Sequence, residues 1–377
     1  MKARGVHLQY SFQPQEQRGA AVQNPLFDLL SAVRENGSIQ RAAAATGSSY
    51  RHVWGALKSW QEVLGEPLVT WVQGHPARLT PFAERLLWAE THARARLTPH
   101  IEALRAELEH VLSEALDGSQ QVLTMYASHD LALPVLRECA RDAERLHIDL
   151  RFAGSIDALR ALAEGRCLVA GFHVPPLAAG VAPAATVFAT SLKPLLKPGR
   201  HKLIGCTRRT QGLIVPRGNP QQLGSLLDVA TQRARFAQRQ AGSATRLLTE
   251  HLLAQDQVDP LRIVVACTED SHTAVATAVA GGLANVGIGI EAAARAYGLD
   301  FVPLAQDDYF LVCLDDALEL PAVQALRRAL QGQTWQDAVS ALPGYALSHP
   351  GEVLSLTRAL PWWSFRKAKE SPMQIIS

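Results

Sequence analysis

The chain has 377 residues, of which 47% are hydrophobic and 19% charged, a globular mixture that is too long for one ordinary core. Its formal net charge of +2 means that any binding of nucleic acid must rest on local rather than overall charge. The five cysteines are widely spaced and form no CxxC pair, which disfavours a zinc site or a disulfide scaffold.

The first 20 residues are polar and contain no apolar signal core, and no run approaches the roughly 18 apolar residues of a membrane span. We therefore expect no signal peptide, no contact with a membrane and a cytoplasmic location. Residues 1–23 are predicted to form a flexible arm, and residues 364–377 a loose basic tail.

Residues 24–80 are predicted to form a winged helix-turn-helix. Apolar residues recur at helical spacing over 26–33, and Gly37 ends this first helix. Ser38 is placed to cap a short, alanine-rich second helix, and Gly47 supplies the tight turn to a third.

The third helix is the predicted DNA reader. Its N-terminus is rich in hydrogen-bond donors, and no acid occurs between residues 48 and 61. The predicted buried face comprises Val53, Leu57, Trp60 and Leu64. Helix-turn-helix proteins present such an N-terminus to base edges, with Arg, Lys and Ser on phosphates. Two short strands around residues 74–76 are predicted to form the wing. The candidate DNA-binding residues are Ser38, Ser48, Ser49, Tyr50, Arg51, His52, Lys58, His75 and Arg78.

Periodicity alone leaves open an all-α bundle that binds nothing. However, the segment closely resembles the N-terminal domain of the molybdate-responsive ModE regulators and, more distantly, LysR-type regulators. The resemblance rests on LLSAVRENGSIQRAAAATGSSYRHVWGALKSW, LGEPLV and ARLTPFAERLL, in that order. It implies that residues 37–47 hold the helix before the reader, that 48–60 are the reader and that 73–78 are the wing. The wing lacks the glycine-rich loop of some relatives.

A long linker or dimerisation helix is predicted over residues 81–118. Its apolar residues recur at alternating gaps of four and three, the narrow seam of a coiled coil. We expect a homodimer, because two readers must span two half-sites. Packing of this seam onto the chain's own domains is the alternative, and a tetramer is left open. The seam comprises Leu97, Ile101, Leu104, Leu108 and Val111.

Residues 119–363 are predicted to form a ligand-sensing domain. Short apolar runs alternate with helical patterns there, which predicts parallel α/β sheets. The stretch 178–200 is rich in Ala, Pro and Gly and is predicted to be a loop. The predicted strands are 122–126, 148–152, 168–172, 263–266 and 286–290, and the predicted helices include 132–146, 155–164, 243–254 and 272–280.

This half resembles the periplasmic binding proteins, in particular the molybdate-binding-like domain fused to ModE-type readers. The resemblance covers about residues 122–330 and rests on YASHDLAL, FAGSIDALRALAEGRCLVAGFH, GLIVPRGNP, RFAQRQAGSATRLL, DDYFLV and the stretch that begins TEDSHTAVATAVAGGLANVGIGI. The predicted fold class is therefore α+β multidomain: an N-terminal winged helix-turn-helix, a long linker helix, and a C-terminal two-lobed α/β domain like the periplasmic binding proteins.

Small polar residues follow several predicted strands, at the start of the next helix. Free N–H groups and the helix dipole favour anions at such positions, and open α/β sheets bind ligands at that edge. Tyr309 lies near the expected return to the first lobe. The candidate ligand-binding residues are Ser128, His129, Asp130, Gly154, Ser155, Arg239, Gln240, Gly242, Ser243, Thr245, Arg246, Thr268, Ser271, His272 and Tyr309.

Each candidate has a structural alternative. A serine at a helix start usually caps the helix, Arg246 can serve as an ion-pair partner, and lone histidines such as His129 and His173 are usually packed or on the surface. Hydroxyl and N–H donors suit a tetrahedral oxyanion such as molybdate or tungstate, which the resemblance also implies. The arginines and histidines leave open a larger organic anion, such as a carboxylate or a pterin phosphate.

The sequence lacks the G-x-S-x-G, P-loop, HExxH and dinucleotide-binding motifs. We therefore expect no enzyme, no catalytic residues, no metal site and no covalently bound cofactor. The expected protein is a transcription regulator whose partners are double-stranded operator DNA, a small anionic effector and a second copy of the chain. In this hypothesis ligand binding closes the lobes and changes DNA affinity.

Overall fold

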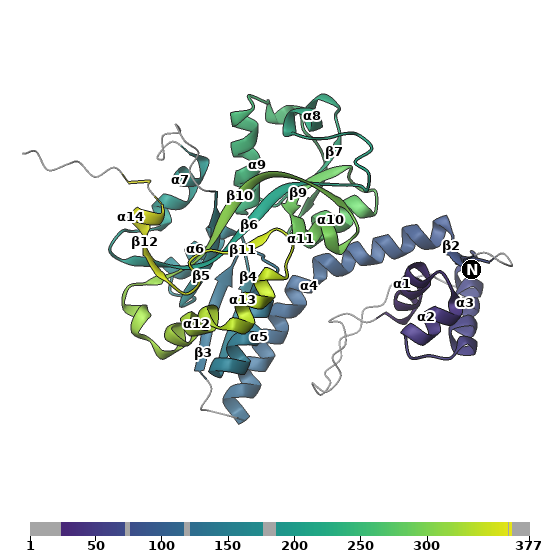
Figure 1. Ribbon diagram of the computed structural model, residues 1–377, viewed down its shortest axis with the longest axis horizontal. Helices are drawn as coiled ribbons and strands as arrows, with labels where there is room; N and C mark the ends of the chain where they lie inside the picture. The colour runs from purple at the N-terminus through teal and green to yellow at the C-terminus, as the bar shows by residue number, and fades with distance from the viewer. Residues whose placement is uncertain (1–23, 72–75, 117–120, 176–185, 361, 364–377) are drawn as a thin grey trace, which may run out of the picture. The chain divides into compact units, whose positions relative to one another are not determined.

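The computed structural model describes residues 24–71, 76–116, 121–175, 186–360 and 362–363 (Figure 1). The chain divides into two compact units. The first comprises residues up to Ile101 together with 280–282, and the second comprises the remaining residues from Glu102 onward. The division falls within a helix that the sequence assigned to a separate linker, so the predicted domain boundaries at residues 80 and 118 stay predictions.

The first unit is built on three short helices and a two-stranded ribbon. Gly37 adopts a φ of +60° and ends the first helix, and Ser38 accepts a hydrogen bond from the N–H of Arg41 at 3.4 Å. Ser49, rather than Ser48, caps the third helix by accepting from His52 N–H at 3.2 Å. These elements are α1 (Pro25–Asn36), α2 (Ile39–Ala45), α3 (Tyr50–Leu64), β1 (Val69–Thr70) and β2 (Arg78–Leu79).

A small apolar core holds this unit together. Leu30, Val33 and Val53 are fully buried and pack with Leu57 and Leu68. Burial of such side chains is worth about 1.5–3 kcal/mol each. The predicted buried face of α3 is confirmed at Val53 and Leu57, Leu64 is half-buried, and the prediction is wrong for Trp60, which is 40% exposed. The long helix α4 (Pro81–Leu116) follows β2 directly and contributes Ala83 and Leu87 to this core.

A ten-stranded mixed sheet forms the centre of the second unit, in the order β4-β3-β5-β10-β6-β9-β7-β8. Parallel pairing joins β3 to β4 and β5, and β7 to β8 and β9. The strands are β3 (Gln121–Ala127), β4 (Leu146–Phe152), β5 (Val169–Val174), β6 (His201–Val215), β7 (Arg235–Arg239), β8 (Val264–Glu269), β9 (Val286–Ile290), β10 (Asp300–Leu314), β11 (Tyr345–Leu347) and β12 (Val353–Ser355).

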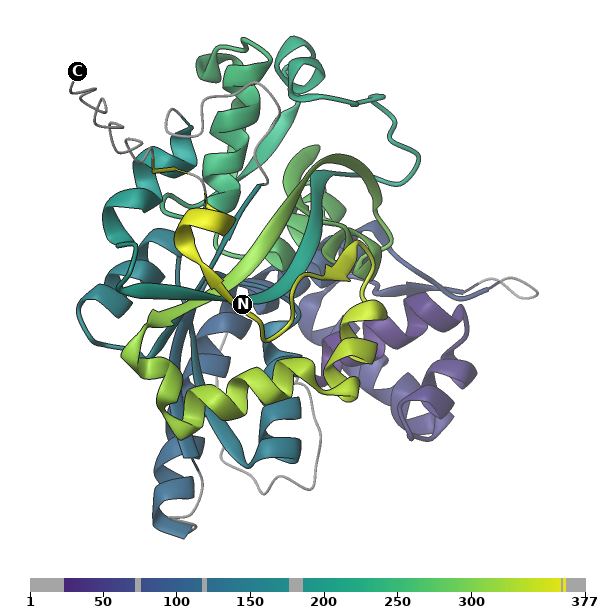
Figure 2. The same ribbon diagram turned by 60° about the vertical axis from the view of Figure 1, so that its left-hand side comes forward.

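Two 15-residue strands, β6 and β10, connect the two groups of parallel strands. They pair antiparallel over most of their length, while β10 also pairs with β5 and β6 also pairs with β9 (Figures 1 and 2). The chain therefore passes between two lobes along these strands. The short strands β11 and β12 both add to the edge of β6.

Helices cover both lobes. One apolar core joins β3 and β4 to α5, α12 and α13 around the fully buried Trp335. A second packs α6, α7 and α9 against β5, and a third fills the lobe of β7 and β9. The helices are α5 (Leu133–Glu144), α6 (Ser155–Ala163), α7 (Val187–Leu192), α8 (Leu226–Thr231), α9 (Ala244–Gln255), α10 (His272–Ala280), α11 (Glu291–Ala296), α12 (Pro321–Gln331), α13 (Gln333–Ser340) and α14 (Leu356–Ala359).

The five predicted strands are all present, and 286–290 has the predicted bounds. Two expectations are wrong. The stretch 178–200 is not entirely loop, because Thr186 caps α7 by accepting from Ala189 N–H at 3.1 Å and Phe188 is buried in the core. The sheet is mixed rather than parallel, because β6 and β10 pair antiparallel with each other and with their neighbours. The sequence did not reveal these two strands, since charged residues in their middle interrupt the apolar run of a buried strand.

Candidate functional site

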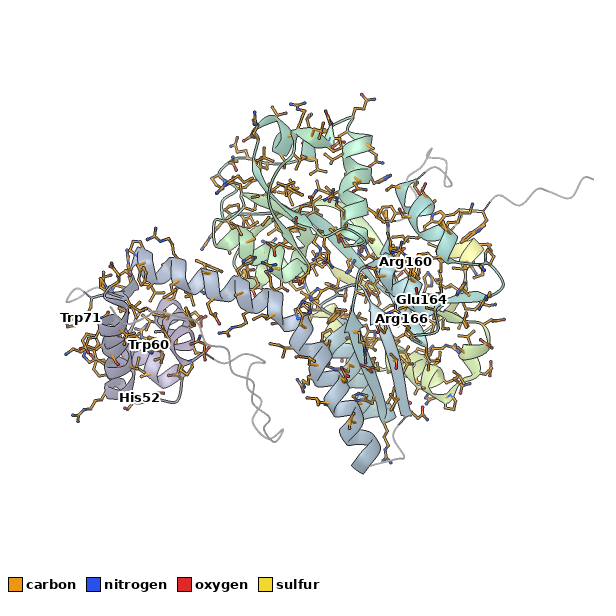
Figure 3. All side chains as sticks on the ribbon, turned by 180° about the vertical axis from the view of Figure 1, so that it is seen from behind. His52, Trp60, Trp71, Arg160, Glu164 and Arg166 are labelled. Atoms are coloured by element: carbon orange, nitrogen blue, oxygen red, sulfur yellow. The ribbon has the colours of Figure 1, made fainter. Side chains whose placement is uncertain are left out.

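The exposed face of α3 carries the predicted DNA-reading residues. Tyr50, Arg51, His52 and Lys58 are all exposed, and no ion pair to an acid holds Arg51 or Lys58 among the residues that the structure describes (His52 is labelled in Figure 3). The ring of Tyr50 stacks on that of Trp54, with centroids 6.4 Å apart and planes 4° apart. This face therefore presents cations and aromatic rings to solvent rather than to the core.

The remaining DNA-binding candidates have mixed positions. Arg78 is exposed on β2, and its backbone carbonyl accepts a hydrogen bond from the Thr70 hydroxyl at 3.2 Å. The Ser48 hydroxyl donates to Thr46 O at 3.4 Å, and the Ser38 side chain caps α2. His75 lies outside the described residues.

In the second unit, the loops at the starts of α6 and α9 touch. Ile156 N–H donates to Gly242 O at 3.3 Å, and a Cβ on Gly154 would lie 2.7 Å from that same oxygen. Gly154 therefore cannot carry a side chain without a shift, and Gly242 adopts a φ of +83° that disfavours one. The contact brings Ser155 and the 243–245 segment together.

Several polar atoms at these strand ends have no hydrogen-bond partner in the described part of the chain. Arg239, which ends β7, is 4% exposed, and neither its Nε nor its Nη1 finds an acceptor. Ser155 Oγ and Thr245 Oγ1 are also unpartnered, on residues that are 0% and 1% exposed. Buried polar groups are normally hydrogen-bonded, so these atoms point to a ligand or ordered water.

Two histidines lie beside this cluster. The rings of His129 and His272 are 6.3 Å apart, and Nδ1 of each is buried without a partner in the described residues. Burial, reinforced by Arg239 and Arg209, lowers the pKa of His129 to about 3 and that of His272 well below its usual range. Both rings are therefore neutral near pH 7 and each offers one N–H donor.

Arg239 is charged under the same conditions. Burial lowers the pKa of its guanidinium to about 10, while the charges of Asp270 and Glu269 act in the opposite direction. The site thus combines one buried cation, two neutral imidazoles and two free hydroxyls, with the side chains of Asp270 and Glu269 near the guanidinium. An anion is the ligand that such donors stabilise most strongly, because hydrogen bonds to a charged partner are stronger than those between neutral groups.

The neutral histidines make stability depend on pH. His129 has a pKa near 6.5 in the unfolded chain and about 3 in the folded one. The folded state is therefore fully stable with respect to this group above pH 6.5, and it loses stability as the pH falls from 6.5 towards 3, because only the unfolded chain then takes up the proton. At pH 5 this histidine alone is expected to reduce the free energy of unfolding by at most about 2 kcal/mol, and His272 acts in the same direction. Urea titrations at pH 7 and pH 5 measure the loss. His129→Gln should reduce it, and an unchanged pH dependence in that variant would contradict the assignment.

A buried ion network lies in the middle of β6 and β10. Arg209 is 0% exposed; its Nε and Nη2 donate to the two oxygens of Asp307 at 3.0 Å, and its Nη1 donates to Asp130 at 2.6 Å. Tyr345 Oη donates to the same Asp130 oxygen at 3.0 Å. Gln211 Nε2 donates to Asp307, and the Arg209 and His173 contacts hold the pKa of that carboxyl well below its usual range.

The sequence did not identify this network. Among the residues of this network, only Asp130 was predicted from the sequence, and it was predicted to bind ligand. Both of its carboxylate oxygens are bonded within the chain: one to Arg209 and Tyr345, the other to Ala132 N–H at 2.7 Å. No local motif marks Arg209 or Asp307, which are 98 residues apart and meet only through strand pairing. Gln211 Oε1 and Thr207 Oγ1, also on β6, are buried without a partner in the described residues and were not proposed either.

Other ligand candidates are occupied by structural contacts. The Tyr309 hydroxyl donates to Ser128 O at 2.8 Å and accepts from Ser128 Oγ at 3.2 Å. Arg246 pairs with Glu250 at 2.8 Å, the ion-pair role left open for it. Ser243 caps α9, Ser271 accepts from Ala274 N–H, Gln240 N–H donates to Glu269 O, and Thr268 is exposed on β8. The side chains of Ser128, Tyr309, Arg246, Ser243 and Ser271 are therefore less available than those of Arg239, Ser155 and Thr245.

Two features are absent from the described residues. None of the helices is both long and apolar enough to cross a membrane. No group of three or more His, Cys, Asp or Glu side chains is arranged to hold a metal ion in the described ranges.

Known proteins resemble this chain in parts. It is 27% identical over 239 residues to the uncharacterised protein YvgK of Bacillus subtilis, covering 63% of this chain and 75% of YvgK. It is 31% identical over 120 residues to the molybdenum-pterin-binding protein MopB of Rhodobacter capsulatus, covering 31% of this chain but only 42% of MopB. A Clostridium pasteurianum protein encoded upstream of a 2Fe-2S ferredoxin gene is 32% identical over 29% of this chain and 97% of its own length.

Solved structures of regulators also align with the chain. Hydrogen-peroxide-bound OxyR C206S of Corynebacterium glutamicum covers 86% of this chain and 95% of its own, with 18% identity and a TM-score of 0.42. Full-length BenM covers 83% and 95%, with 15% identity and a TM-score of 0.41.

The family matches decide the assignment. The PBP superfamily domain matches residues 136–331, just over half of the chain, and the bacterial regulatory helix-turn-helix of the lysR family matches residues 26–84. The resemblances to LysR-type regulators and to the periplasmic binding proteins are confirmed, while the closer likeness to ModE stays a prediction. The chain therefore belongs to the PBP superfamily domain family and is a LysR-type DNA-binding regulator that carries a PBP-like effector-binding domain after its helix-turn-helix.

Proposed function

We propose that this regulator binds operator DNA through α3 and that a small anion, held by the second unit at Arg239, modulates that binding. The observation that carries the effector half is the buried guanidinium of Arg239, whose Nε and Nη1 have no acceptor in the described residues. Leaving buried donors of a charged group unsatisfied costs about 1–3 kcal/mol or more, which a bound anion would recover. The anion can shift DNA affinity only by binding one arrangement of the protein more tightly than another.

A tetrahedral oxyanion such as molybdate or tungstate fits this donor set. Ser155, Thr245 and Arg239 offer hydroxyl and N–H donors, which are what a fully deprotonated oxyanion accepts. The partial likeness to MopB, a molybdenum-pterin-binding protein, supports the same choice. Isothermal titration with molybdate, tungstate, sulfate and formate tests this proposal. If none of the four anions gives heat of binding, the oxyanion is refuted.

One observation favours an organic anion instead. Gln211 donates its amide N–H to the Asp307 carboxylate, so the amide cannot be flipped and Oε1 must remain the buried, unpartnered acceptor. An acceptor of this kind calls for a ligand with its own N–H or O–H. A pterin phosphate carries both an anionic group and such donors, and so does a carboxylate whose remaining part bears an N–H or O–H group. Binding of pterin-6-carboxylate but not of molybdate in the same titration would select this alternative.

We also propose that the regulator is a homodimer joined along α4 and acts in the cytoplasm, where operator DNA lies. Four of the five seam residues are exposed in the single chain, and Ile101 is half-buried: Leu97 is 37% exposed, Leu104 55%, Leu108 41% and Val111 58%. An exposed row at coiled-coil spacing supports a partner helix. Light scattering measures the oligomeric state, and a monomer at micromolar concentration would contradict the proposal. We propose no catalytic role for the chain.

For the DNA half, Arg51→Ala is expected to weaken operator binding by about ten- to a hundred-fold, because a base- or phosphate-contacting arginine is worth roughly 1–3 kcal/mol. The duplex is selected from a random pool by the wild-type protein and titrated by fluorescence anisotropy. Arg41→Ala, at an exposed arginine on α2, is the comparison. Equal affinity of Arg51→Ala and wild type for that duplex would refute the reading helix.

A further inference from the structure

The exposed face of α3 has a gap at its centre, at Gly55. This glycine lies inside the 15-residue helix Tyr50–Leu64 and is exposed. Its φ is outside the left-handed region, and a Cβ added there would meet no atom within 4 Å. Nothing in the described fold therefore requires a glycine at this position.

The stability of the helix alone would favour a residue other than glycine at position 55. Glycine in a helix interior is destabilising relative to alanine, because it loses more conformational freedom when the helix forms. Where a glycine is neither conformationally required nor packed against a neighbour, one remaining physical reason for it is the close approach of something outside the chain.

The surroundings of Gly55 indicate what approaches. Residues three and four positions away are its neighbours on a helix surface. At Gly55 these four are Arg51, His52, Lys58 and Ser59, and all are exposed. Each carries a hydrogen-bond donor, and none carries a negative charge near pH 7. Hydrogen-bond donors therefore occupy all four of these neighbouring positions around Gly55.

The partner must be rich in acceptors and have a convex edge that enters the gap. The stacked rings of Tyr50 and Trp54 border the same face and offer flat apolar surfaces. Glu62, the first acid along this face, is two turns further on and also exposed, so the donor-lined part ends before it. Duplex DNA has acceptor-bearing base edges and phosphates in this arrangement.

We propose that duplex DNA approaches the backbone of α3 at Gly55 more closely than any side chain at that position would allow. Gly55 is a positioning residue: it offers no atom for recognition, but it sets the depth at which Arg51 and Lys58 reach the DNA. The inference rests on the proposed DNA-binding function of α3 and adds to it a steric determinant of docking.

The test uses full-length Gly55→Ala and Gly55→Gln with a duplex selected from a random pool by the wild-type protein. Both variants should melt at or above the wild-type temperature. Gly55→Ala should bind the duplex more weakly than wild type, and Gly55→Gln at least about ten-fold more weakly. Val63→Gln is the matched control, since Val63 is 60% exposed on the same helix more than two turns away, and it should keep wild-type affinity.

The outcomes separate this inference from the function on which it rests. A folded Gly55→Gln that binds as tightly as wild type overturns the inference, provided that Arg51→Ala weakens binding to the same duplex. Equal losses in Gly55→Gln and Val63→Gln also overturn it, because the effect would then not be specific to the gap. A wild-type protein that selects no duplex overturns both the inference and the proposed DNA-binding function.

Discussion

Replacing Arg209 by methionine is expected to destabilise the second unit by about 3–5 kcal/mol, because it leaves two buried carboxylates without their cation. Asp130 and Asp307 are each 1% exposed and both are ion-paired to this one guanidinium. The Arg209 charge also holds the pKa of Asp307 below its usual range, so the methionine variant must either bury an unpaired charge or bind a proton. Urea unfolding followed by circular dichroism measures the change.

The adjacent residue provides the control. Arg208 pairs with Asp308 at 2.7 and 2.9 Å, the same bidentate geometry, but its side chain is 43% exposed. Exposed ion pairs contribute about 0–1 kcal/mol, so Arg208→Met should be nearly neutral. If Arg209→Met were as stable as Arg208→Met, the network would not be what holds the middle of the two long strands.

Replacing Arg239 by glutamine is expected to weaken binding of molybdate by about ten- to a hundred-fold, since a hydrogen bond to a charged group is worth roughly 1.5–3 kcal/mol. The free energy of unfolding should fall far less than in Arg209→Met, because Nε and Nη1 of Arg239 bond to nothing in the described residues. Isothermal titration and urea unfolding of the same preparation measure both quantities.

Arg246→Gln is the matched control for that substitution. Arg246 lies only seven residues after Arg239, in the first turn of α9, but its side chain pairs with Glu250 and is 31% exposed. It should therefore keep the affinity of the wild type for molybdate. Equal losses in the two variants would show that general positive charge, rather than the buried guanidinium, attracts the anion.

Much of the architecture could be predicted from the sequence because its signals are local. Ser38 and Gly37 mark a helix start and end by their own backbone chemistry, and the alternation of apolar runs marks parallel strands with helices between them. A general rule about strand ends led us to expect that the turns of Gly154 and Gly242 face one cleft, but no motif predicted that these two residues touch.

The long strands and their ion network could not be predicted in this way. The middle of β6 reads as polar because Arg208 and Arg209 interrupt its apolar residues, and their partners Asp307 and Asp308 lie about a hundred positions away. Only the antiparallel register places these charges opposite one another. Likewise, the sequence could name Ser128 and Tyr309 as candidates but not reveal that they bond to each other.

The most direct test of the account is the affinity of wild-type protein for its selected duplex, measured by fluorescence anisotropy with and without saturating molybdate or, if titration favours it, pterin-6-carboxylate. The account predicts that the anion changes the dissociation constant by about 5- to 150-fold, the usual range of coupling between two sites, and that Arg239→Gln abolishes the change. A dissociation constant that is the same with and without an anion known to bind would contradict it.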